Sequence, residues 1–496
     1  MSVDYDLIIL GATPAGIQTA IAAATLKARV ALITQDCSPH SAPELIPHHG
    51  LLHLAHQADQ WQHVASLPFW SADSKELVLQ GAQVTAWMAA VVGNVATVRS
   101  VAALAAYGVD VIPGLGEFCR KPAPGVVVGQ RFLQARGYLL AVGSRPRIPA
   151  IAGLDTVNYF TPETLPTHLG AIASAATIAV LGAGKTAVEL AQALNHLGHQ
   201  VILLTEQRSL LPDADREVAQ WLQAHLEAAG VQVWLQAAIK RVQQLPPDSA
   251  TQTPTGQKRL WLGTKSLDVD ELAIAAGQTP NLASLNLEAV AVRWTDQGIV
   301  HNQKLQTTNA RIYACEGRVG SECFTQLANH EAAIALKNIL FFPRSRLDRQ
   351  RVPFTVHTSP ELAWIGLTTE QATQQYGNHQ VYTLRQPCSI LPSAQLQNDL
   401  SGFCQLIVHR NGTLLGAHLV GNQVSAAIAV LALAMQQRLK IGAIAALPFP
   451  TPTMTEILHH TAADFRRLQF KHTPWLQDLV DHFFDLRRAW SRNSPS

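Results

Sequence analysis

The stretch TIAVLGAGKTAVELAQALNHLGHQVILLTE at residues 177–206 decides the fold of this chain. It reads as a buried strand, a glycine-containing turn, a helix and a second strand, which together form a βαβ unit. In such a turn Gly182 allows the tight bend, Gly184 lets a pyrophosphate approach the backbone, and Ala187 lets the helix pack closely against the strand. The stretch predicts an α/β sheet with a dinucleotide at the turn, or the same unit kept for structure without a ligand.

The end of the second strand bears on which dinucleotide this turn would bind. Glu206 stands where a carboxylate accepts hydrogen bonds from the adenosine ribose, which favours NAD. Arg208, two residues later, would instead suit the 2′-phosphate of NADP. The pattern favours NAD and leaves NADP open.

A second βαβ pattern, YDLIILGATPAGIQTAIAAATLKARVALIT, occupies residues 5–34. Gly11 and Gly16 fill the first and third glycine places, whereas Thr13 fills the second and brings both bulk and a hydroxyl donor. The acidic residue that would bind the ribose is displaced beyond the strand, where Asp36 is the candidate. Nucleotide binding is expected here too, on a weaker motif.

The whole chain has the composition of a globular, multidomain protein. It has 496 residues, 48% of them hydrophobic and 15% charged, and its net charge of +2 gives no electrostatic case for nucleic acid. Six cysteines without CxxC spacing suit a reducing, cytoplasmic compartment. The N-terminal run, with Asp4 and Asp6, does not resemble a signal peptide, and the apolar run at 426–435 is too short to span a bilayer.

Four more motifs accompany the two βαβ units in a fixed order. They are YLLAVGSRPRIPAIAG at 138–153, LAIAAGQTPN at 272–281, VPFTVHTSPELAWIGLTTEQA at 352–372 and GFCQLIVHRNGTLLGAHLVG at 402–421. Together the six stretches resemble the pyridine nucleotide-disulfide oxidoreductases, the family of dihydrolipoamide dehydrogenase, glutathione reductase and mercuric reductase. Gly143, in the first of the four, is a further candidate cofactor-binding residue.

The resemblance implies an α/β protein with two Rossmann-type nucleotide-binding domains, for FAD and NAD(P), and an α+β C-terminal dimerisation domain. It also implies FAD and NAD(P)H as cofactors and a homodimer as the assembly. The expected segments are a first FAD-binding part at 1–155, an NAD(P)-binding domain at 156–277, an FAD-binding return segment at 278–350, the dimerisation domain at 351–464 and an amphipathic tail at 465–496.

The redox helix is where the chain departs most from this family. The family motif C-x-x-x-x-C-I-P-S-K-x-L-L is matched here by LIPHHGLLH at 45–53, so His40 and Leu45 stand at the cysteine positions and no flavin disulfide can form. The lysine of the motif falls on His49, and its usual glutamate partner matches Glu189. We therefore expect a His49–Glu189 pair that exchanges a proton near neutral pH.

The family's acid–base catalyst is also absent. Its H-P-T-x-x-E motif matches PFPTPTMTEILHH at 448–460, where Thr451 replaces the histidine and Glu456 is kept as a candidate catalytic residue. Because the base serves the dithiol, the two losses are consistent with one another.

Two cofactor-contact positions of the family also differ. Glu316 and Gly317 stand at its Gly-Asp pair, whose aspartate binds the flavin ribityl chain. Lys185 stands where the family has a tyrosine that gates the nicotinamide. Retention of FAD is therefore the main question that the sequence leaves.

Four functions are compatible with these residues. The leading one is an oxidoreductase that passes electrons from NAD(P)H through FAD to a small-molecule or protein acceptor: a quinone, a metal ion, another nicotinamide or a carrier protein. The second is a non-catalytic, dimeric nucleotide-binding or regulatory protein. The third uses Cys37 as a lone redox thiol. The fourth is a metal site among His40, His48, His49 and His53, which neighbouring helical positions make difficult, so no metal is expected.

The tail beyond the matched region predicts an amphipathic helix. Residues 465–492 carry Trp475, Leu476, Leu479, Val480, Phe483, Leu486 and Trp490 at helical spacing, with arginines at both ends. The helix is expected to pack on its own subunit or the dimer partner, or else to lie on a membrane surface, which would favour a quinone as acceptor.

Overall fold

The computed structural model describes residues 3–35, 46–66, 80–98, 100–120, 124–246, 256–315, 325–471 and 474–492. The chain divides into two compact units, Met1–Asp348 and Arg349–Ser496. The first unit contains the segments that are expected to bind FAD, 1–155 and 278–350, and the segment expected to bind NAD(P), 156–277.

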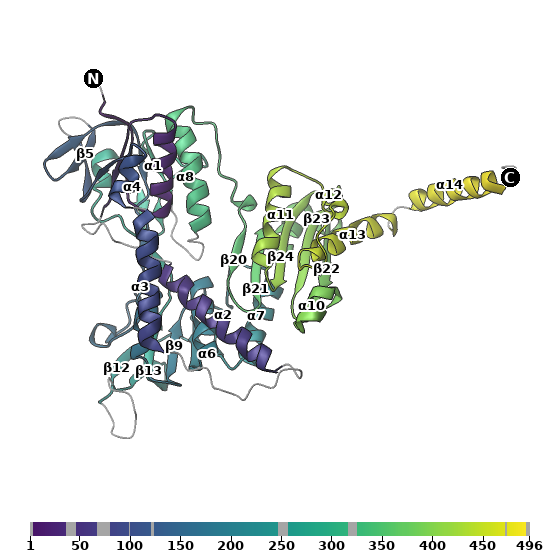
Figure 1. Cartoon of the computed structure of the whole chain (residues 1–496), viewed down its shortest axis with the longest axis horizontal. Coiled ribbons are helices and arrows are strands. Elements are labelled where there is room, and N and C mark those ends of the chain that lie inside the picture. The colour runs from purple at the N-terminus through teal and green to yellow at the C-terminus, as the bar shows by residue number, and fades with distance from the viewer. Residues whose placement is uncertain are drawn as a thin grey trace. The chain divides into compact units, whose positions relative to one another are not determined.

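The FAD-binding segments are built on a five-stranded parallel sheet (Figure 1). Its strand order is β19 (Ile312–Ala314), β7 (Ala135–Leu140), β1 (Tyr5–Leu10), β2 (Val30–Ile33) and β3 (Asp110–Ile112). The helices α1 (Pro14–Thr25) and α8 (Thr325–Leu340) pack against each other and against these strands. A small antiparallel sheet of β4 (Gly116–Cys119), β5 (Gly125–Val128) and β6 (Arg131–Leu133) joins the same core, where the rings of Phe118 and Tyr138 meet edge to face.

The NAD(P)-binding segment repeats the plan on a four-stranded parallel sheet. Its strand order is β11 (Gln232–Trp234), β10 (Gln200–Leu204), β9 (Thr177–Leu181) and β15 (Glu271–Ile274). The helices α6 (Lys185–His196) and α7 (Arg216–Ala228) contact these strands. A β-meander of β12 (Arg241–Gln244), β13 (Lys258–Leu262) and β14 (Lys265–Val269) packs on the same core. Two short pairs, β8 (Ser144–Pro146) with β16 (Gln278–Pro280) and β17 (Trp294–Thr295) with β18 (Gly298–Ile299), complete the unit.

The α-helices that the structure describes between β2 and β9 are α2 (Ile46–Ser66), α3 (Gly81–Val98), α4 (Val101–Ala106) and α5 (Leu165–His168). The helix α2 packs along α6, so an element of the FAD-binding segment contacts the helix that follows the NAD(P) turn. The run Gly81–Ala106, which spans α3 and α4, is long and apolar enough to cross a membrane by length and composition, and 12% of the tested window is buried. One such run is weak evidence for a membrane span.

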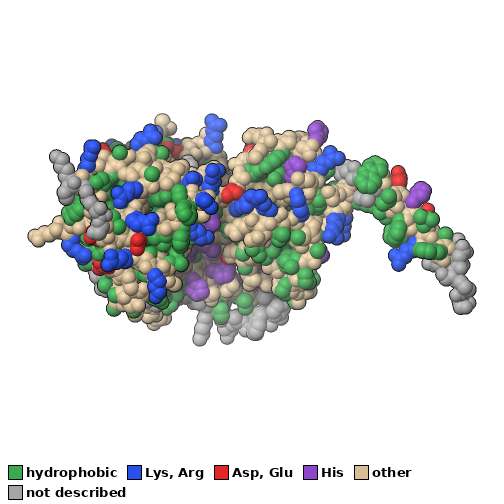
Figure 2. All heavy atoms as spheres, turned by 90° about the horizontal axis from the view of Figure 1, so that it is seen from above, with side chains coloured by type: hydrophobic (Ala, Val, Ile, Leu, Met, Phe, Trp, Pro, Cys, Tyr) green, Lys and Arg blue, Asp and Glu red, His purple; other side chains and the backbone are tan. Residues whose placement is uncertain are grey.

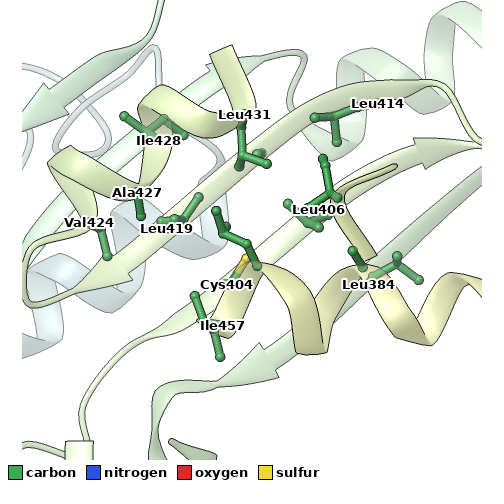
Figure 3. Packing of buried hydrophobic residues seen from close by; sticks show 14 of the residues in the cluster. Leu384, Cys404, Leu406, Leu414, Leu419, Val424, Ala427, Ile428, Leu431 and Ile457 are labelled. Carbon is green, nitrogen blue, oxygen red and sulfur yellow. The ribbon is translucent and has the colours of Figure 1, made fainter. Parts of the chain in front are cut away.

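The second unit is an antiparallel sheet covered by helices on both faces. Its strand order is β20 (Phe354–Val356), β21 (Glu361–Gly366), β24 (Leu414–Gly421), β23 (Phe403–His409) and β22 (Val381–Pro387). On one face pack α11 (Val424–Gln436) and α13 (Glu456–Lys471), whose contact with α12 (Ile441–Ala446) extends that layer. Figure 3 shows this core, in which Leu406 and Leu419 of the strands meet Leu431 and Ile457 of the helices.

On the other face of this sheet lies α9 (Thr369–Tyr376), against Ile407 and Leu415. Neighbouring strand residues thus serve opposite faces, as the two-residue period of a strand requires. A short helix, α10 (Pro392–Gln397), follows β22.

The last helix, α14 (Pro474–Arg492), follows α13 and keeps large apolar side chains in contact with solvent (Figure 2). Trp475, Leu479, Phe483, Leu486 and Trp490 are between 55% and 80% exposed. Within the second unit, the described residues do not cover this apolar face of α14.

Candidate functional site

The first glycine turn has the close contacts that its motif predicts. Gly11 has φ +110°, and a Cβ atom there would lie 1.9 Å from the carbonyl oxygen of Ala141, so only glycine fits. A Cβ on Gly16 would lie 2.2 Å from the carbonyl oxygen of Gly11. Thr13 is the N-cap of α1, and its Oγ1 accepts a hydrogen bond from the Gly16 amide at 3.3 Å. The threonine in the second place thus stabilises the helix end that a phosphate would approach.

Several predicted FAD contacts fall outside the described residues, among them Asp36, Glu316 and Gly317, and so do Cys37, His40 and Leu45. The last described residue after β2 is Gln35, with φ +62°. Its side-chain Nε2 donates a hydrogen bond to the carbonyl oxygen of Gly116 at 3.1 Å, and its Oε1 accepts one from the Gly116 backbone N–H at 3.3 Å. Gly143 has φ +67°, and its carbonyl accepts a hydrogen bond from the Asn281 amide at 3.2 Å. Gly143 is thereby tied to the return segment.

The two glycines of the second turn differ in the space that surrounds them. A Cβ on Gly182 would lie 2.2 Å from the carbonyl oxygen of Ala275 and 2.8 Å from the Cβ of Ala187, so these two residues set the strand–helix distance. Gly184 is the N-cap of α6, and a Cβ there would meet nothing within 4 Å among the described residues. Open space before a helix N-terminus suits a pyrophosphate.

Glu206 lies two residues past the end of β10 and is exposed, with Thr205 buried between them. Arg208 is exposed as well. Both side chains are therefore reachable by a bound nucleotide.

The histidine found in contact with Glu189 is His48, the residue before the predicted partner His49, and the catalytic part of His49 stays a prediction. The Nε2 of His48 lies 3.1 Å from the Oε2 of Glu189, and the two side chains are 3% and 0% exposed. His49 is exposed. Neighbouring residues on a helix point about 100° apart, so only one of the two histidines can face α6.

Two further features surround this pair. The Nζ of Lys185 lies 3.6 Å from the other carboxylate oxygen of Glu189, one helical turn earlier on α6. The Nδ1 of His48 is buried and has no hydrogen-bond partner among the described residues. Buried polar atoms are rarely left without a partner, so this one is a candidate to accept or donate a hydrogen bond to a bound group.

A second contact joins the same two helices farther along. The Nε2 of His196 lies 3.7 Å from Asp59 Oδ1. Burial lowers the pKa of His196, an effect that the nearby Asp59 carboxylate opposes.

Two further histidines of α2, His49 and His53, have aromatic contacts. The ring of His53 stacks on Trp87 of α3 with centroids 6.2 Å apart, and the exposed His49 is edge-on to His48 at 6.0 Å. The described residues contain no group of three His, Cys, Asp or Glu side chains arranged to hold a metal ion.

The two cysteines of the second unit lie in its hydrophobic core. Cys388 and Cys404 are buried in its core, and burial raises the pKa of each thiol to about 12. Both thiols are therefore protonated and inert at neutral pH.

Glu456 has local partners at the start of α13. Its Oε1 accepts a hydrogen bond from the Thr453 amide at 2.8 Å, and its Oε2 accepts one from the Thr451 hydroxyl at 3.0 Å. Threonine at position 451 thus keeps the contact with the glutamate but supplies no group that takes a proton at neutral pH.

The geometry agrees with comparisons to known proteins. Residues 5–330 match the family described as pyridine nucleotide-disulphide oxidoreductase, and residues 352–462 match its dimerisation domain. The chain belongs to this family. Its fold is the expected one, with two Rossmann-type domains and a C-terminal dimerisation domain, and members use FAD with NAD(P)H as electron donor.

Its relatives include several named oxidoreductases. A mercuric reductase of Staphylococcus aureus is 27% identical over 467 residues, which cover 93% of this chain and 82% of that protein. A dihydrolipoyl dehydrogenase of Geobacillus stearothermophilus is 25% identical over 467 residues, which cover 93% of this chain and 96% of that protein. The solved HOCl-induced flavoprotein disulfide reductase RclA of Escherichia coli superimposes with a TM-score of 0.77 at 24% identity, over 92% of this chain and 99% of RclA. This structural likeness supports the fold.

Proposed function

We propose that this protein is an FAD-dependent NAD(P)H oxidoreductase that passes electrons to an acceptor other than a bound disulfide. The observation that carries the proposal is the buried His48–Glu189 contact. It lies one residue before His49, where the resemblance places the lysine of the family's Lys–Glu pair. The sequence around it has His40 and Leu45 at the cysteine positions. A protonatable buried pair without a neighbouring dithiol suits flavin chemistry that does not use a disulfide.

The described residues have definite parts in this reaction. The open turn at Gly184 and the N-terminus of α6 would bind the pyrophosphate of NAD(P)H, and Glu206 would orient the adenosine ribose. The turn at Gly11, capped by Thr13, and the buried Nδ1 of His48 fit FAD.

FAD, when bound, supplies the two-electron chemistry between the nicotinamide and the acceptor. The packing of α2 along α6 excludes water from Glu189, while His48 holds a proton on Nε2. Glu456 is a weaker candidate for a catalytic part, because both of its oxygens serve the turn before α13.

The proposal also concerns the class of electron acceptor. A quinone, a metal ion, another nicotinamide or a carrier protein each accepts electrons from flavin without a protein thiol. Steady-state NADH oxidation with ferricyanide and a soluble quinone, against oxidised lipoamide and glutathione disulfide as controls, tests this directly. Turnover with the disulfides would contradict it.

The alternative is a non-catalytic nucleotide-binding or regulatory descendant of the family. The replacement of the dithiol, of the catalytic histidine at Thr451 and of the Gly-Asp pair at Glu316 and Gly317 supports it. It predicts that NADH binds but is not oxidised. Rapid flavin reduction by NADH would exclude it.

The assembly follows from the family. The dimerisation-domain match at residues 352–462 indicates a homodimer. We place the protein in the cytoplasm, which its scattered cysteines support.

Peripheral membrane contact through the tail is a separate part of the proposal. It is supported by the exposed apolar side chains of α14 and by six basic against three acidic residues in 465–492. The full-length protein should co-sediment with vesicles of anionic lipid, whereas a variant truncated after Lys471 should not. The truncated variant keeps Phe465 of α13, which is buried in the core. Equal pelleting of the two proteins would remove this part.

A further inference from the structure

The chain that follows α8 carries two adjacent aromatic side chains in contact with solvent. Phe341 and Phe342 are 61% and 70% exposed, and Pro343 after them is exposed as well. Single apolar side chains are normal on a protein surface, whereas a contiguous exposed group is typical of an interaction site. Residues 341–346, the aromatic turn, are therefore a candidate contact surface.

Hydrogen bonds hold the aromatic turn in place. The side chain of Asn338, which is 2% exposed, donates to the carbonyl oxygen of Ser345 at 2.9 Å and accepts from the Ser345 amide at 3.0 Å. It also donates to the carbonyl oxygen of Lys304 at 3.0 Å, and the Leu347 amide donates to that of Gln303 at 2.7 Å. The turn is thus fixed before any partner binds, so binding would cost little further ordering of its backbone.

Basic side chains accompany these rings. Arg344 and Arg346 lie in the aromatic turn, Lys337 lies in the last turn of α8, and all three are exposed. The guanidinium of Arg344 lies over the ring of Phe342, 5.4 Å from its centroid. From Lys337 to Asp348 the sequence has these three basic residues and one acidic residue, Asp348. The surface thus combines aromatic rings with a positive charge.

We propose that the aromatic turn is a contact site for an anionic lipid surface. Phe341 and Phe342 would enter the boundary between headgroups and acyl chains, while the basic side chains face the lipid phosphates. A second copy of the chain fits this surface less well, since a two-fold interface centred here would bring the same positive side chains together. The site lies in the first unit, whereas α14 lies in the second, and it does not depend on the oxidoreductase reaction.

Co-sedimentation of the full-length protein with vesicles tests the site. The vesicles are phosphatidylcholine alone or phosphatidylcholine mixed with phosphatidylserine. A variant with Arg344→Gln and Arg346→Gln should bind the anionic vesicles about tenfold more weakly than wild type, because each basic side chain near such a surface contributes about a fivefold gain. A variant with Phe341→Ser and Phe342→Ser should lose binding by a similar factor. Both variants keep α14, since a single small turn attaches only weakly by itself.

A matched control removes two other exposed apolar side chains of the first unit. Tyr107 and Leu115 are 58% and 51% exposed, and a variant with Tyr107→Ser and Leu115→Ser should bind vesicles as wild type does. Pelleting of the phenylalanine and arginine variants equal to that of wild type overturns the proposal. Sedimentation velocity of the phenylalanine variant should show an unchanged oligomeric state. Dissociation into monomers would show that a second copy covers the turn, which also overturns the proposal.

Amide hydrogen exchange of the wild-type protein separates this contact from that of the tail. With anionic vesicles present, peptides that cover residues 341–346 should exchange more slowly than without them. Slower exchange confined to α14 would support the tail contact and overturn the one proposed here. Because neither readout uses NADH or flavin, a failure of this proposal is distinct from a failure of the proposed oxidoreductase activity.

Discussion

His48 and Glu189 meet through Nε2 and Oε2 at 3.1 Å, with both side chains buried between α2 and α6. The contact joins the FAD-binding segment to the helix that follows the NAD(P) turn. A proton held at this contact lies beside the helix whose N-terminus would bind the nicotinamide dinucleotide, which is why the pair is central to the proposed activity.

Removing the carboxylate tests how much this contact stabilises the fold. Glu189→Ala removes the carboxylate that faces the Nε2 of His48 and the ammonium of Lys185. Breaking a buried pair at one side costs about 3–5 kcal/mol, so the free energy of unfolding should fall by about that amount. Chemical denaturation measures it, with Glu206→Ala as an exposed control that should change stability little. A loss in Glu189→Ala no larger than in the control would contradict the buried pairing.

The two glycines of the NAD(P) turn should separate folding from binding. Gly182→Ala places a Cβ 2.2 Å from a backbone oxygen and should destabilise the fold. Gly184→Val projects into open space and should fold normally but bind NADH weakly, because it fills the room for the pyrophosphate. Thermal unfolding and NADH titration of both variants check this pattern. The reverse pattern would place the dinucleotide elsewhere.

Loss of the N-cap of α1 should lower the stability of the fold by a modest amount. Thr13→Ala removes the hydroxyl that accepts from the Gly16 amide and should cost about 1 kcal/mol of stability. Thr97→Ala, at an exposed position near the end of α3, provides a matched loss of one hydroxyl. Denaturation midpoints measure both. An equal effect at the two positions would show that Thr13 has no special role as a cap.

Two partly buried histidines predict that the fold loses stability in mild acid. Burial lowers the pKa values of His196 and His199, so in mild acid the unfolded chain binds protons that the folded chain does not. Stability should therefore be present above the ordinary histidine pKa of about 6.5 and fall as pH drops toward the lowered folded-state values. Unfolding of wild type and of His199→Gln between neutral and mildly acid pH checks this. A slope unchanged in the variant would count against His199.

The glycine turns could be predicted from the sequence because they depend on local geometry. Gly182 and Ala187 are spaced by the strand–turn–helix itself, and the structure brings them within contact distance, as the motif requires. The resemblance to a family, which rests on the order of several such motifs, was confirmed in the same way by the family matches.

The register of α2 could not be predicted with the same certainty. Two adjacent histidines match two positions of the family motif, and only the packing of α2 on α6 decides that His48 is the buried one. The sequence also gave no sign that Lys185 contacts Glu189, although their spacing of four residues on a helix permits it. The roles of Asp36, Glu316 and Gly317 stay predictions, since these residues lie outside the described part of the chain.

The most direct test of the proposed function is anaerobic titration of the purified protein with NADH, followed by its visible absorption spectrum. We expect bound FAD that is fully reduced by one equivalent of NADH per flavin, because no disulfide is present beside the flavin to take up a second electron pair. Absence of flavin after reconstitution with FAD, or flavin that NADH does not reduce, would contradict the proposed activity, and uptake of a second equivalent would contradict the missing disulfide.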